Sequence, residues 1–363
     1  MISQCPRQRA AEAALKGEST ERGVRGLTRA PCTLISTGLA HLQRRSCFIF
    51  SDNIEVSYAA VTAQFTDAMR AAGLLTDAII TADGVLHRFH VEGDKSRTRN
   101  GWYVLHGDGI PAGCFGNWKG ICVTWRADIG RKLNADEERH HRERMAAIKL
   151  QREQETKSRH KEASDKASAL WQRASPANPA HRYLVKKSVR AYGIRQLDNH
   201  LLIPLRDTSG CLHGLQFIGS DGAKMFGTGT AKAGHYHSIG NAPNEVLAIC
   251  EGYATGASIH AATRWPVVIA FDAGNLRPVS QALRNKYPSI TLLICADNDR
   301  NNPDNPGLNK GREAARSVGG IVIAPAFAAS STGTDWNDHA SEYGMEATRA
   351  QLLGVLAEIS HVA

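Results

Sequence analysis

The chain has 363 residues, with 44 Lys and Arg against 35 Asp and Glu, and a net charge of +9 at pH 7. This length allows about two or three compact domains, and no apolar run approaches the roughly 18 to 20 residues that span a bilayer. The N-terminal residues also lack the continuous apolar core of a secretory signal. We therefore expect a cytoplasmic protein without a membrane partner, and the positive charge favours a polyanion, with nucleic acid as the first candidate.

The eight cysteines are scattered along the chain and include no Cys-x-x-Cys pair. Zinc ribbons hold their metal with such closely spaced cysteine pairs. We therefore predict no zinc site and interpret the cysteines as core or surface thiols.

Composition and pattern divide the chain into six segments. Residues 1–56 are basic, contain few aromatics and show no periodicity, which predicts a disordered basic tail; the alternative that translation starts later stays open. The other segments are a β-rich N-terminal module (57–128), a charged helical linker (129–175), a basic subdomain (176–242), an α/β domain (243–345) and a C-terminal helix (346–363).

The N-terminal module begins with a helical pattern and continues as short strands. Apolar residues recur at helical spacing from Ala59 to Ala72, and Gly73 supplies a stop. Four strand-like runs follow, separated by Asp-Gly and Asn-Gly turns, at residues 78–82, 86–91, 101–106 and 120–125. The pattern predicts one short helix against a small β-rich fold.

Aromatic side chains are interleaved with cations in this module. They are Trp102, Tyr103, Phe115, Trp118 and Trp125, beside Lys95, Arg97, Arg99 and Lys119. Such a mixture suits single-stranded nucleic acid, because bases stack on aromatic faces while cations neutralise phosphates. Aromatics also dominate small cores, which is the interpretation we favour for any one of them. For the basic loop at 95–99, a binding loop and a solvated loop are equally good interpretations.

A charged segment separates this module from the rest of the chain. Residues 132–175 contain no Gly or Pro and are rich in Arg, Lys, Glu and Ala, which predicts a long solvated helix. Pro176 and Pro179 end it. Residues 180–240 then read as short strands joined by turns, starting with the run at 183–187.

Four short apolar runs organise the next hundred residues. They lie at 245–250, 266–271, 290–295 and 321–324, and they alternate with helix-compatible segments at 254–263, 276–287 and 310–318. Strand and helix in alternation predict an α/β fold, a parallel sheet with covering helices. Ligands bind beyond the carboxyl ends of such strands, where Glu251, Asp297 and Asp299 would meet.

Asp297 and Asp299 stand two apart after a strand, so both side chains can leave the same edge while Asn298 points elsewhere. Carboxylates so close repel one another unless a hard cation lies between them. Mg²⁺ takes oxygen ligands and substrate phosphates, and two such ions can activate a hydroxyl and stabilise a leaving oxygen. The pattern predicts Mg²⁺, or Mn²⁺, at Glu251, Asp297 and Asp299.

The acidic clusters together resemble the Toprim domain, the metal-binding fold shared by bacterial-type primases, topoisomerases and small nucleases. The resemblance rests on Glu251-Gly-Tyr-Ala-Thr-Gly256, Asp272-Ala-Gly274 and Asp297-Asn-Asp299 in this order. It implies catalytic and metal-binding roles for Glu251, Asp297 and Asp299, and a further ligand at Asp338 or Asp335. Two departures stand out: residues 300–307 delay the expected helix start, and only Gly274 matches in the second cluster, so that Asp272 can be structural.

The segment before the acidic clusters is similar to the basic subdomain that precedes Toprim in plasmid and phage primases. The similarity is carried by the runs at 203–207, 214–218 and 222–226, and by the β module and charged helix at 59–175. It implies a core that holds template and nucleotide, with five cations as expected phosphate contacts. These are Arg206, Lys224, Lys232, Lys186 and Lys187.

The leading hypothesis is therefore a DNA primase of the plasmid or phage type. The resemblance implies Mg²⁺-dependent synthesis of short RNA primers, with single-stranded DNA and ribonucleoside triphosphates as partners, and it allows a separate replicative helicase. A Toprim nuclease, which would use water as the attacking group, is the second hypothesis. A non-catalytic single-stranded DNA-binding protein of a mobile element is the third, and the retained carboxylates weigh against it.

Overall fold

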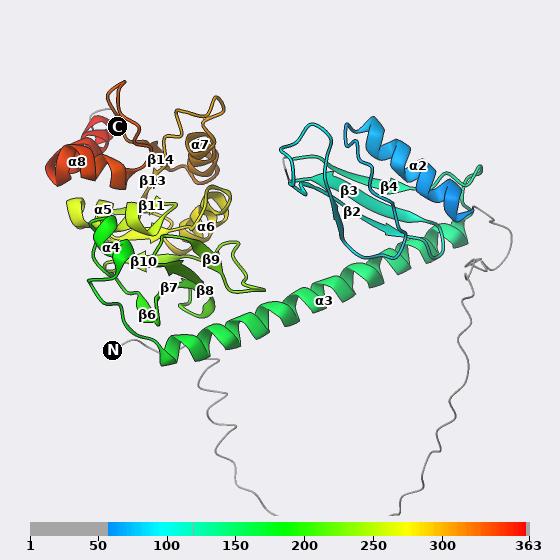
Figure 1. The fold of residues 1–363 in the computed structure, drawn as a ribbon, viewed down its shortest axis with the longest axis horizontal. Coiled ribbons are helices and arrows are strands. Elements are labelled where there is room, and N and C mark those ends of the chain that lie inside the picture. The colour runs from blue at the N-terminus through cyan, green and yellow to red at the C-terminus, as the bar shows by residue number, and fades with distance from the viewer. Residues whose placement is uncertain (1–56, 119, 361–363) are drawn as a thin grey trace, which may run out of the picture. The chain divides into compact units, whose positions relative to one another are not determined.

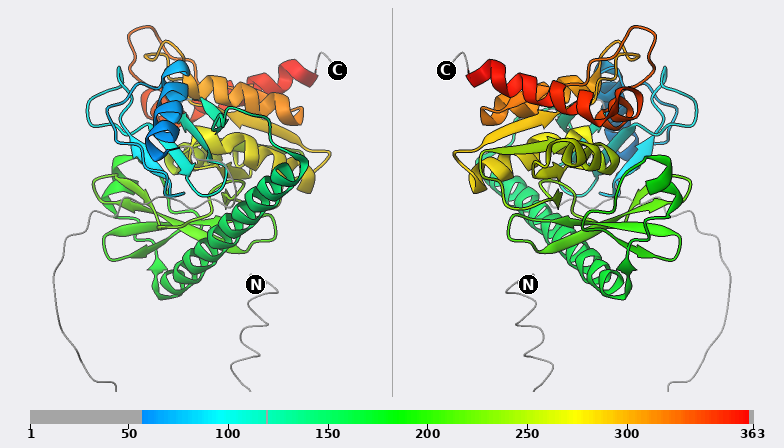
Figure 2. Two further views of the ribbon diagram at one scale, coloured as in Figure 1. Left: turned by 90° about the vertical axis from the view of Figure 1, so that its right-hand side faces the viewer. Right: turned by 90° about the vertical axis from the view of Figure 1, so that its left-hand side faces the viewer.

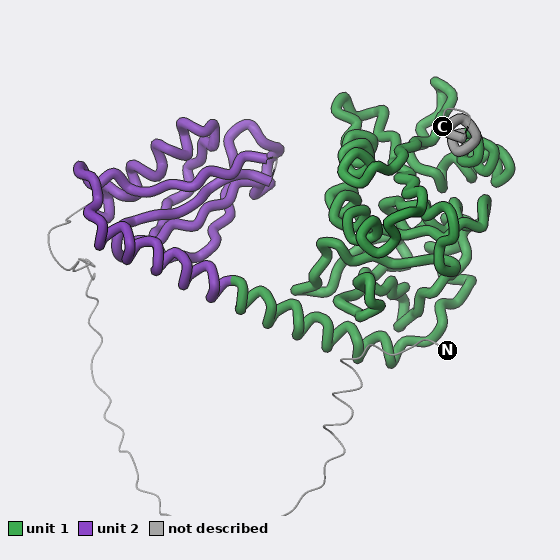
Figure 3. Tube along the Cα trace, turned by 180° about the vertical axis from the view of Figure 1, so that it is seen from behind, with its two compact units in different colours: residues 1–21, 153–363 green, residues 22–152 purple. Residues whose placement is uncertain are grey.

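The structure is a computed structural model that describes residues 57–118 and 120–360. The tail predicted at 1–56 lies outside the described residues. The chain divides into two compact units between Arg152 and Glu153, within the helix α3 (Ala135–Arg173), as the two colours of Figure 3 show. In the described part, none of the helices combines the length and the apolar character needed to cross a membrane.

In chain order, the first unit is the purple one of Figure 3 (unit 2 in its key) and the second unit is the green one (unit 1 in its key). The first unit is a four-stranded antiparallel sheet flanked by helices. The helix α2 (Tyr58–Ala71) and the first half of α3 flank the strands (Figure 1). The strands follow chain order, β1 (His87–Phe89), β2 (Gly101–His106), β3 (Ala112–Asn117) and β4 (Cys122–Arg126). The predicted helix and β-rich fold are confirmed.

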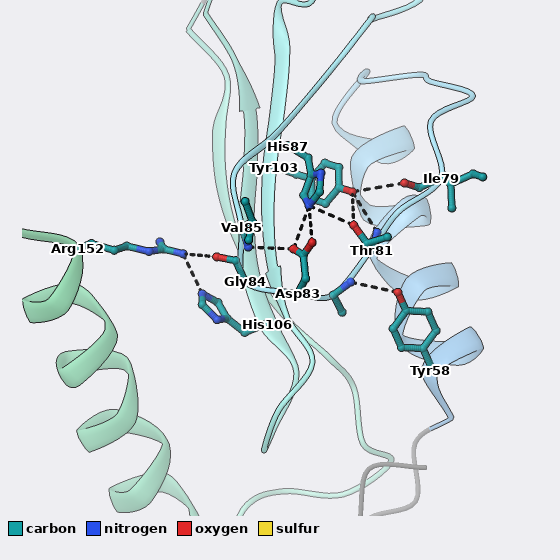
Figure 4. A network of polar contacts seen from close by, with 11 residues as sticks. Tyr58, Ile79, Thr81, Asp83, Gly84, Val85, His87, Tyr103, His106 and Arg152 are labelled. Atoms are coloured by element: carbon teal, nitrogen blue, oxygen red, sulfur yellow. Dashed lines mark hydrogen bonds and ion pairs between the residues drawn. The ribbon is translucent and has the colours of Figure 1, made fainter. Parts of the chain in front are cut away.

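The prediction of a strand at residues 78–82 is wrong. This segment has no ladder partner, and Ile79 is 89% exposed. Side chains hold it instead: the Tyr103 hydroxyl accepts from the amide of Thr81 at 3.0 Å, and His87 Nε2 lies 2.9 Å from the Asp83 carboxylate (Figure 4). An apolar run becomes a strand only where a neighbouring edge offers backbone partners, and none is offered here.

One face of this sheet forms the core of the unit. Phe65 of α2 packs edge-on against Tyr103, Phe115 and Trp125, with ring centroids 5.8, 5.3 and 5.0 Å apart. Tyr103 and Phe115 are fully buried. These three aromatics of the sequence pattern are core residues, as the less specific interpretation predicted.

The second unit starts with the rest of α3 and a second antiparallel sheet. The strands lie in chain order, β5 (Ser175–Pro176), β6 (Arg195–Leu197), β7 (His200–Arg206), β8 (Leu212–Gly219) and β9 (Lys224–Phe226). The run at 183–187 is not a strand but belongs to the helix α4 (Arg182–Lys186), which corrects the sequence prediction. The buried side chain of His181 caps it by accepting from the amide of Tyr183, and burial of two consecutive residues, Tyr183 and Leu184, fits a helix face rather than a strand's alternation.

The parallel sheet confirms the predicted fold class. Its order is β10-β12-β11-β13-β14, and only the edge strand β10 (His237–Ile239) is antiparallel. The parallel strands are β11 (Val246–Cys250), β12 (Val267–Ile269), β13 (Thr291–Cys295) and β14 (Ile321–Ile323), each within a predicted run. The helices are α5 (Tyr253–Thr263), α6 (Ala273–Lys286), α7 (Pro306–Val318) and α8 (Trp336–Ser360).

Helices cover both faces of this sheet (Figure 1). Leu247 and Ile249 pack with residues of α6 and α7, whereas Ala248 and Cys250 pack with residues of α5 and α8. The helix α8 consists of two helical segments that meet at Gly344, where φ is 87°, and the helix predicted at 346–363 corresponds to the second segment; residues 361–363 are not described. Glycine tolerates this left-handed backbone.

The core under α5 continues into the antiparallel sheet. Leu184, Leu201 and Ile203 share one cluster of buried residues with Tyr253 and Trp336. Figure 2 shows the green strands of the antiparallel sheet beside the yellow strands of the parallel sheet. The basic subdomain and the α/β domain are therefore stabilised by the same apolar contacts.

We expect residues 243–363, produced alone, to show no cooperative thermal unfolding. This fragment lacks Leu201 and Ile203, which share one cluster of buried residues with Tyr253 of α5, and hydrophobic burial is the main stabilising term of a domain. Circular dichroism during heating, with the full chain as control, measures this. A fragment that melts cooperatively near the full chain's Tm would show that the shared core is dispensable.

Candidate functional site

Acidic residues follow three adjacent strands of the parallel sheet. Ile249 of β11 lies opposite Ile294 of β13, so Glu251 and Ala296 stand at the same level beyond the strands, with Asp297 next. Asp272 follows β12, on the other side of β11. We call the carboxyl edge of the sheet, with Glu251, Asp272, Asp297 and Asp299, the acidic rim. The register of the strands brings Glu251 and Asp297 together there.

Two oxygen atoms of the acidic rim are buried without a hydrogen-bond partner. They are Glu251 Oε1 and Asp297 Oδ1. A buried carboxylate oxygen left unpaired costs free energy, and native structures keep such groups where a ligand or ion satisfies them. These two atoms mark the place where the rim is incomplete by itself.

Two carboxyl groups of the rim, those of Glu251 and Asp297, have raised pKa values. Burial, followed by the charges of Asp299 and Asp272, raises the pKa of Glu251 to about 7. Burial, followed by the charges of Glu251 and Asp335, raises the pKa of Asp297 to about 8, against the opposing effect of Lys224. A cation in place of the protons would relieve both burial and repulsion.

Asp299 is fixed by the start of α7. Its Oδ2 accepts from the amide of Gly307 at 3.0 Å, and its own amide donates to Asn305 Oδ1 at 2.9 Å. Asn305 also caps the helix, and Pro306 is its first residue. The helix start is therefore delayed along the chain but still meets the acidic rim, because residues 300–305 loop out and return.

Asn298 points away from the rim, as its place between the two Asp residues predicts. Its side chain donates to the carbonyl of Pro325 at 3.0 Å and accepts from Asn305 at 2.9 Å. These hydrogen bonds hold the loop after β13 in place while Asp297 and Asp299 face the rim.

The two downstream candidates lie in different surroundings. The Asp338 carboxylate accepts from the amide of Thr334 at 3.1 Å and lies 3.6 Å from Lys187 Nζ. Asp335 accepts from the amide of Asp338 and raises the pKa of both Glu251 and Asp297 through its charge. Asp335 is therefore electrostatically coupled to the rim, whereas Asp338 is engaged by a helix terminus and a lysine.

Two of the predicted cations lie against the acidic residues. Lys224, in β9, is close enough to Asp297 to lower its pKa. Lys232 forms an ion pair with Asp272, whose other oxygen caps α6 by accepting from Asn275 at 3.1 Å. Asp272 has the structural part that the sequence allowed, and it also adds charge to the rim.

The other three predicted cations are not gathered with these two. Arg206 donates to the carbonyl of Gly210 at 2.8 Å and lies 5.7 Å from the ring centre of Trp171 of α3. Lys187 pairs with Asp338, and Lys186 is exposed at the end of α4.

Among the described residues, no three His, Cys, Asp or Glu side chains are grouped closely enough to hold a metal ion as they stand. Mg²⁺ suits such a rim, because it is usually bound by one or two carboxylates and completed by water and phosphate oxygens.

Sequence reasoning missed Asn305 and Gly307. A Cβ atom on Gly307 would lie 2.9 Å from the carbonyl oxygen of Asp297 and 3.0 Å from Asp299 Oδ2, so glycine lets α7 approach the rim. The sequence carries a signal for this helix start, because Asn followed by Pro is typical of a helix N-terminus. The predicted helix nevertheless begins only at Lys310.

Comparisons with known proteins agree with these observations. Residues 246–346 match the family model of the Toprim domain. A DNA primase TraC of Escherichia coli is 35% identical over 283 residues, covering 73% of this chain and 19% of TraC. A second Escherichia coli DNA primase TraC is 33% identical over 299 residues, covering 76% of this chain and 28% of that protein. The chain thus spans less than a third of these relatives.

A solved structure similar to the chain is the primase fragment of the bacteriophage T7 primase-helicase. It is 15% identical, with a TM-score of 0.37, and the match covers 49% of this chain and 79% of that one.

We expect the protein without divalent cations to lose stability as the pH rises from about 4 to about 8. The ordinary pKa values are 4.5 for Glu251 and 3.8 for Asp297, and folding raises them to about 7 and about 8. In that window the folded state binds more protons than the unfolded state, so raising the pH favours unfolding. Thermal unfolding in a chelator at several pH values measures the effect, and each kcal/mol lowers Tm by about 2 to 4 °C.

The double variant Glu251→Gln, Asp297→Asn is the control for this titration. It removes both ionisable groups and should flatten the loss of Tm over the same window. An equally steep loss in the double variant would assign the pH dependence to other groups.

Gly307→Ala should destabilise the protein by about 1 to 3 kcal/mol, the usual cost of forcing an added carbon into a packed site. The new methyl would press on the backbone of Asp297 and the carboxylate of Asp299. Gly354→Ala in α8 is the matched control, because nothing lies within 4 Å of its Cβ position, and replacing a helical glycine should gain about 0.5 to 1 kcal/mol. Urea unfolding of both variants measures the difference, and equal stabilities would contradict the close approach.

Proposed function

We propose that the protein is a Mg²⁺-dependent DNA primase, starting from the match of residues 246–346 to the family model of the Toprim domain. The observation that carries the proposal is the pair of partnerless buried oxygens, Glu251 Oε1 and Asp297 Oδ1, at the ends of neighbouring strands and beside Lys224. Such a rim suits a cation that carries a triphosphate.

Two observations support primer synthesis over hydrolysis. The segment before the rim shares a core with it and places Lys224 and Lys232 against the acidic residues; a site that only activates water needs no such segment. The two proteins that match about three quarters of the chain are both DNA primases.

Glu251, Asp297 and Asp299 would hold the ions, with Asp335 better placed than Asp338 to add a charge. The donor set consists of carboxylate oxygens, which Mg²⁺ and Mn²⁺ prefer, and the two unpaired oxygens fit that demand. When bound, the ions supply positive charge that acidifies a hydroxyl and stabilises a departing oxygen.

In the proposed reaction, the 3′ oxygen of one ribonucleotide attacks the α-phosphorus of the next. A P–O bond to the attacking oxygen forms, the bond from the α-phosphorus to the bridging oxygen breaks, pyrophosphate leaves, and the hydroxyl proton passes to water. Lys224 and Lys232 neutralise phosphate charge that develops beside the rim. Asn305 and Gly307 keep Asp299 oriented.

Single-stranded DNA as template and ribonucleoside triphosphates as substrates follow from this reaction, and so does a cytoplasmic place of action. Similarity to TraC supports a role in the replication of a mobile element such as a plasmid. A separate replicative helicase would supply the unwound strand, because the reaction itself opens no duplex.

The full chain should make short oligoribonucleotides on single-stranded DNA when supplied with Mg²⁺ and labelled ribonucleotides. Glu251→Gln and Asp297→Asn should each lower the rate about 100- to 1,000-fold, the range seen when one group that stabilises developing charge is removed. Gel electrophoresis of the products measures the rate.

Glu313→Gln is the matched control, because Glu313 is an exposed carboxylate that pairs with Arg277 and Lys310 on the surface. It should leave synthesis unchanged. Cleavage of the DNA without synthesis would favour the nuclease, and salt-sensitive binding with neither activity would favour a non-catalytic DNA-binding protein.

A further inference from the structure

The sheet of the first unit has a second face that the core does not use. In β4, the core side carries Val123 and Trp125, while Cys122, Thr124 and Arg126 alternate onto the other side and are exposed. Period-two alternation places every second residue of the neighbouring strands on the same side.

One row of residues crosses this outer face. Arg88 lies opposite Trp102, Trp102 opposite Gly116, and Gly116 opposite Cys122. Gly116 leaves space for the indole, because a Cβ atom there would lie 2.9 Å from Trp102 Cζ2. The row therefore places a tryptophan beside a residue without a side chain, with an arginine at its β1 end.

Trp118, just after β3, extends this row. Its ring centre lies 6.3 Å from that of Trp102 and 5.1 Å from the Arg88 guanidinium, and its side chain is 60% exposed. Hydrophobic burial would place so large an aromatic in a core, and the core of this unit is complete without it. We call Arg88, Trp102 and Trp118 the tryptophan row.

A basic loop borders the tryptophan row. The amide of Trp118 donates to the carbonyl of Asn100 at 3.1 Å, and Asn100 donates to Asp94 at 2.9 Å, which fixes the loop that carries Lys95, Arg97 and Arg99. All three cations are exposed, and within the described part of the chain no salt bridge engages them.

The other end of the same face is occupied. Arg152 of α3 donates to the carbonyl of Gly84 at 3.2 Å and contacts His106 Nε2 at 3.0 Å (Figure 4). His106 stands on the outer side of β2, four residues beyond Trp102. Among the described residues, α3 thus covers the His106 end of the face, whereas Trp118 of the tryptophan row stays exposed.

We propose that the tryptophan row is a docking site for single-stranded DNA. Unpaired bases stack on exposed aromatic rings, and each phosphate needs a nearby cation; the row and its basic loop offer both within one unit. Duplex DNA would hide its bases from the rings, and an acidic protein would leave the paired indoles without a planar partner. The inference extends the proposed function with a second binding surface for the template, yet its test needs no catalysis.

Trp118→Ala should weaken binding of a fluorescein-labelled oligothymidylate by about 5- to 150-fold, the effect of removing one base stack. Trp118→Phe should restore most of the affinity, because a ring remains. Arg88→Ala should reduce the steepness of log Kd against log salt by about 0.7 for each phosphate that the arginine no longer neutralises. Fluorescence anisotropy of the full chain in a chelator measures all three.

Ile79→Ala and Arg70→Ala are the matched controls. Ile79 is 89% exposed outside the row, and Arg70 lies on α2, which covers the opposite face of the sheet. Both should bind like the unaltered protein. Because the measurement is made in a chelator and without ribonucleotides, it does not depend on the reaction at the rim. Unchanged affinity in Trp118→Ala with an intact circular dichroism spectrum, or equal affinity for duplex DNA, would overturn the proposal.

Discussion

Repulsion between carboxylates at one end of a buried parallel sheet is the constraint on which the second unit depends. The register of β11 and β13 forces Glu251 and Asp297 to leave the sheet side by side, where little water screens them. The surrounding residues compensate the excess negative charge in several ways. Asp272 is paired with Lys232, Asp299 accepts from the start of α7, and only Glu251 and Asp297 keep unpaired buried oxygens among the described carboxylates.

The same constraint explains why the antiparallel sheet packs against the parallel sheet and shares its core. Lys224 counters the charge of Asp297 from β9, which pairs with β8, and β8 contributes Ile218 to the core shared with the parallel sheet. Hydrogen bonds also join the segment after α4 to the helices of the parallel sheet: the Tyr253 hydroxyl of α5 donates to the carbonyl of Arg190 at 2.9 Å, and Asn337 of α8 donates to that of Lys187 at 2.8 Å. The apolar packing that joins the two sheets therefore also determines which charges lie beside the acidic rim.

Sequence periodicity predicted the parallel sheet, its helices and the acidic rim, because apolar runs and the residues that follow them carry local signals. It failed where long-range contacts decide. The run at 78–82 has strand-like residues but no neighbouring edge, and residues 183–187 became helical around the cap of His181. Likewise, no local signal separates Asp335, which is coupled to the rim, from Asp338, which is tied to Lys187.

The aromatics of the first unit show what register adds to composition. Trp102 and Tyr103 are adjacent in β2, yet alternation sends Tyr103 into the core and Trp102 to the outer face. Glycine at position 116, opposite Trp102, makes room for two neighbours: a Cβ atom there would lie 2.1 Å from the carbonyl oxygen of Ile121 and 2.9 Å from Trp102 Cζ2. A nucleobase stacks on an aromatic ring that solvent can reach, whereas a core needs only volume. The register of β2, and not its composition, therefore decides which of the two adjacent aromatics is available on the outer face.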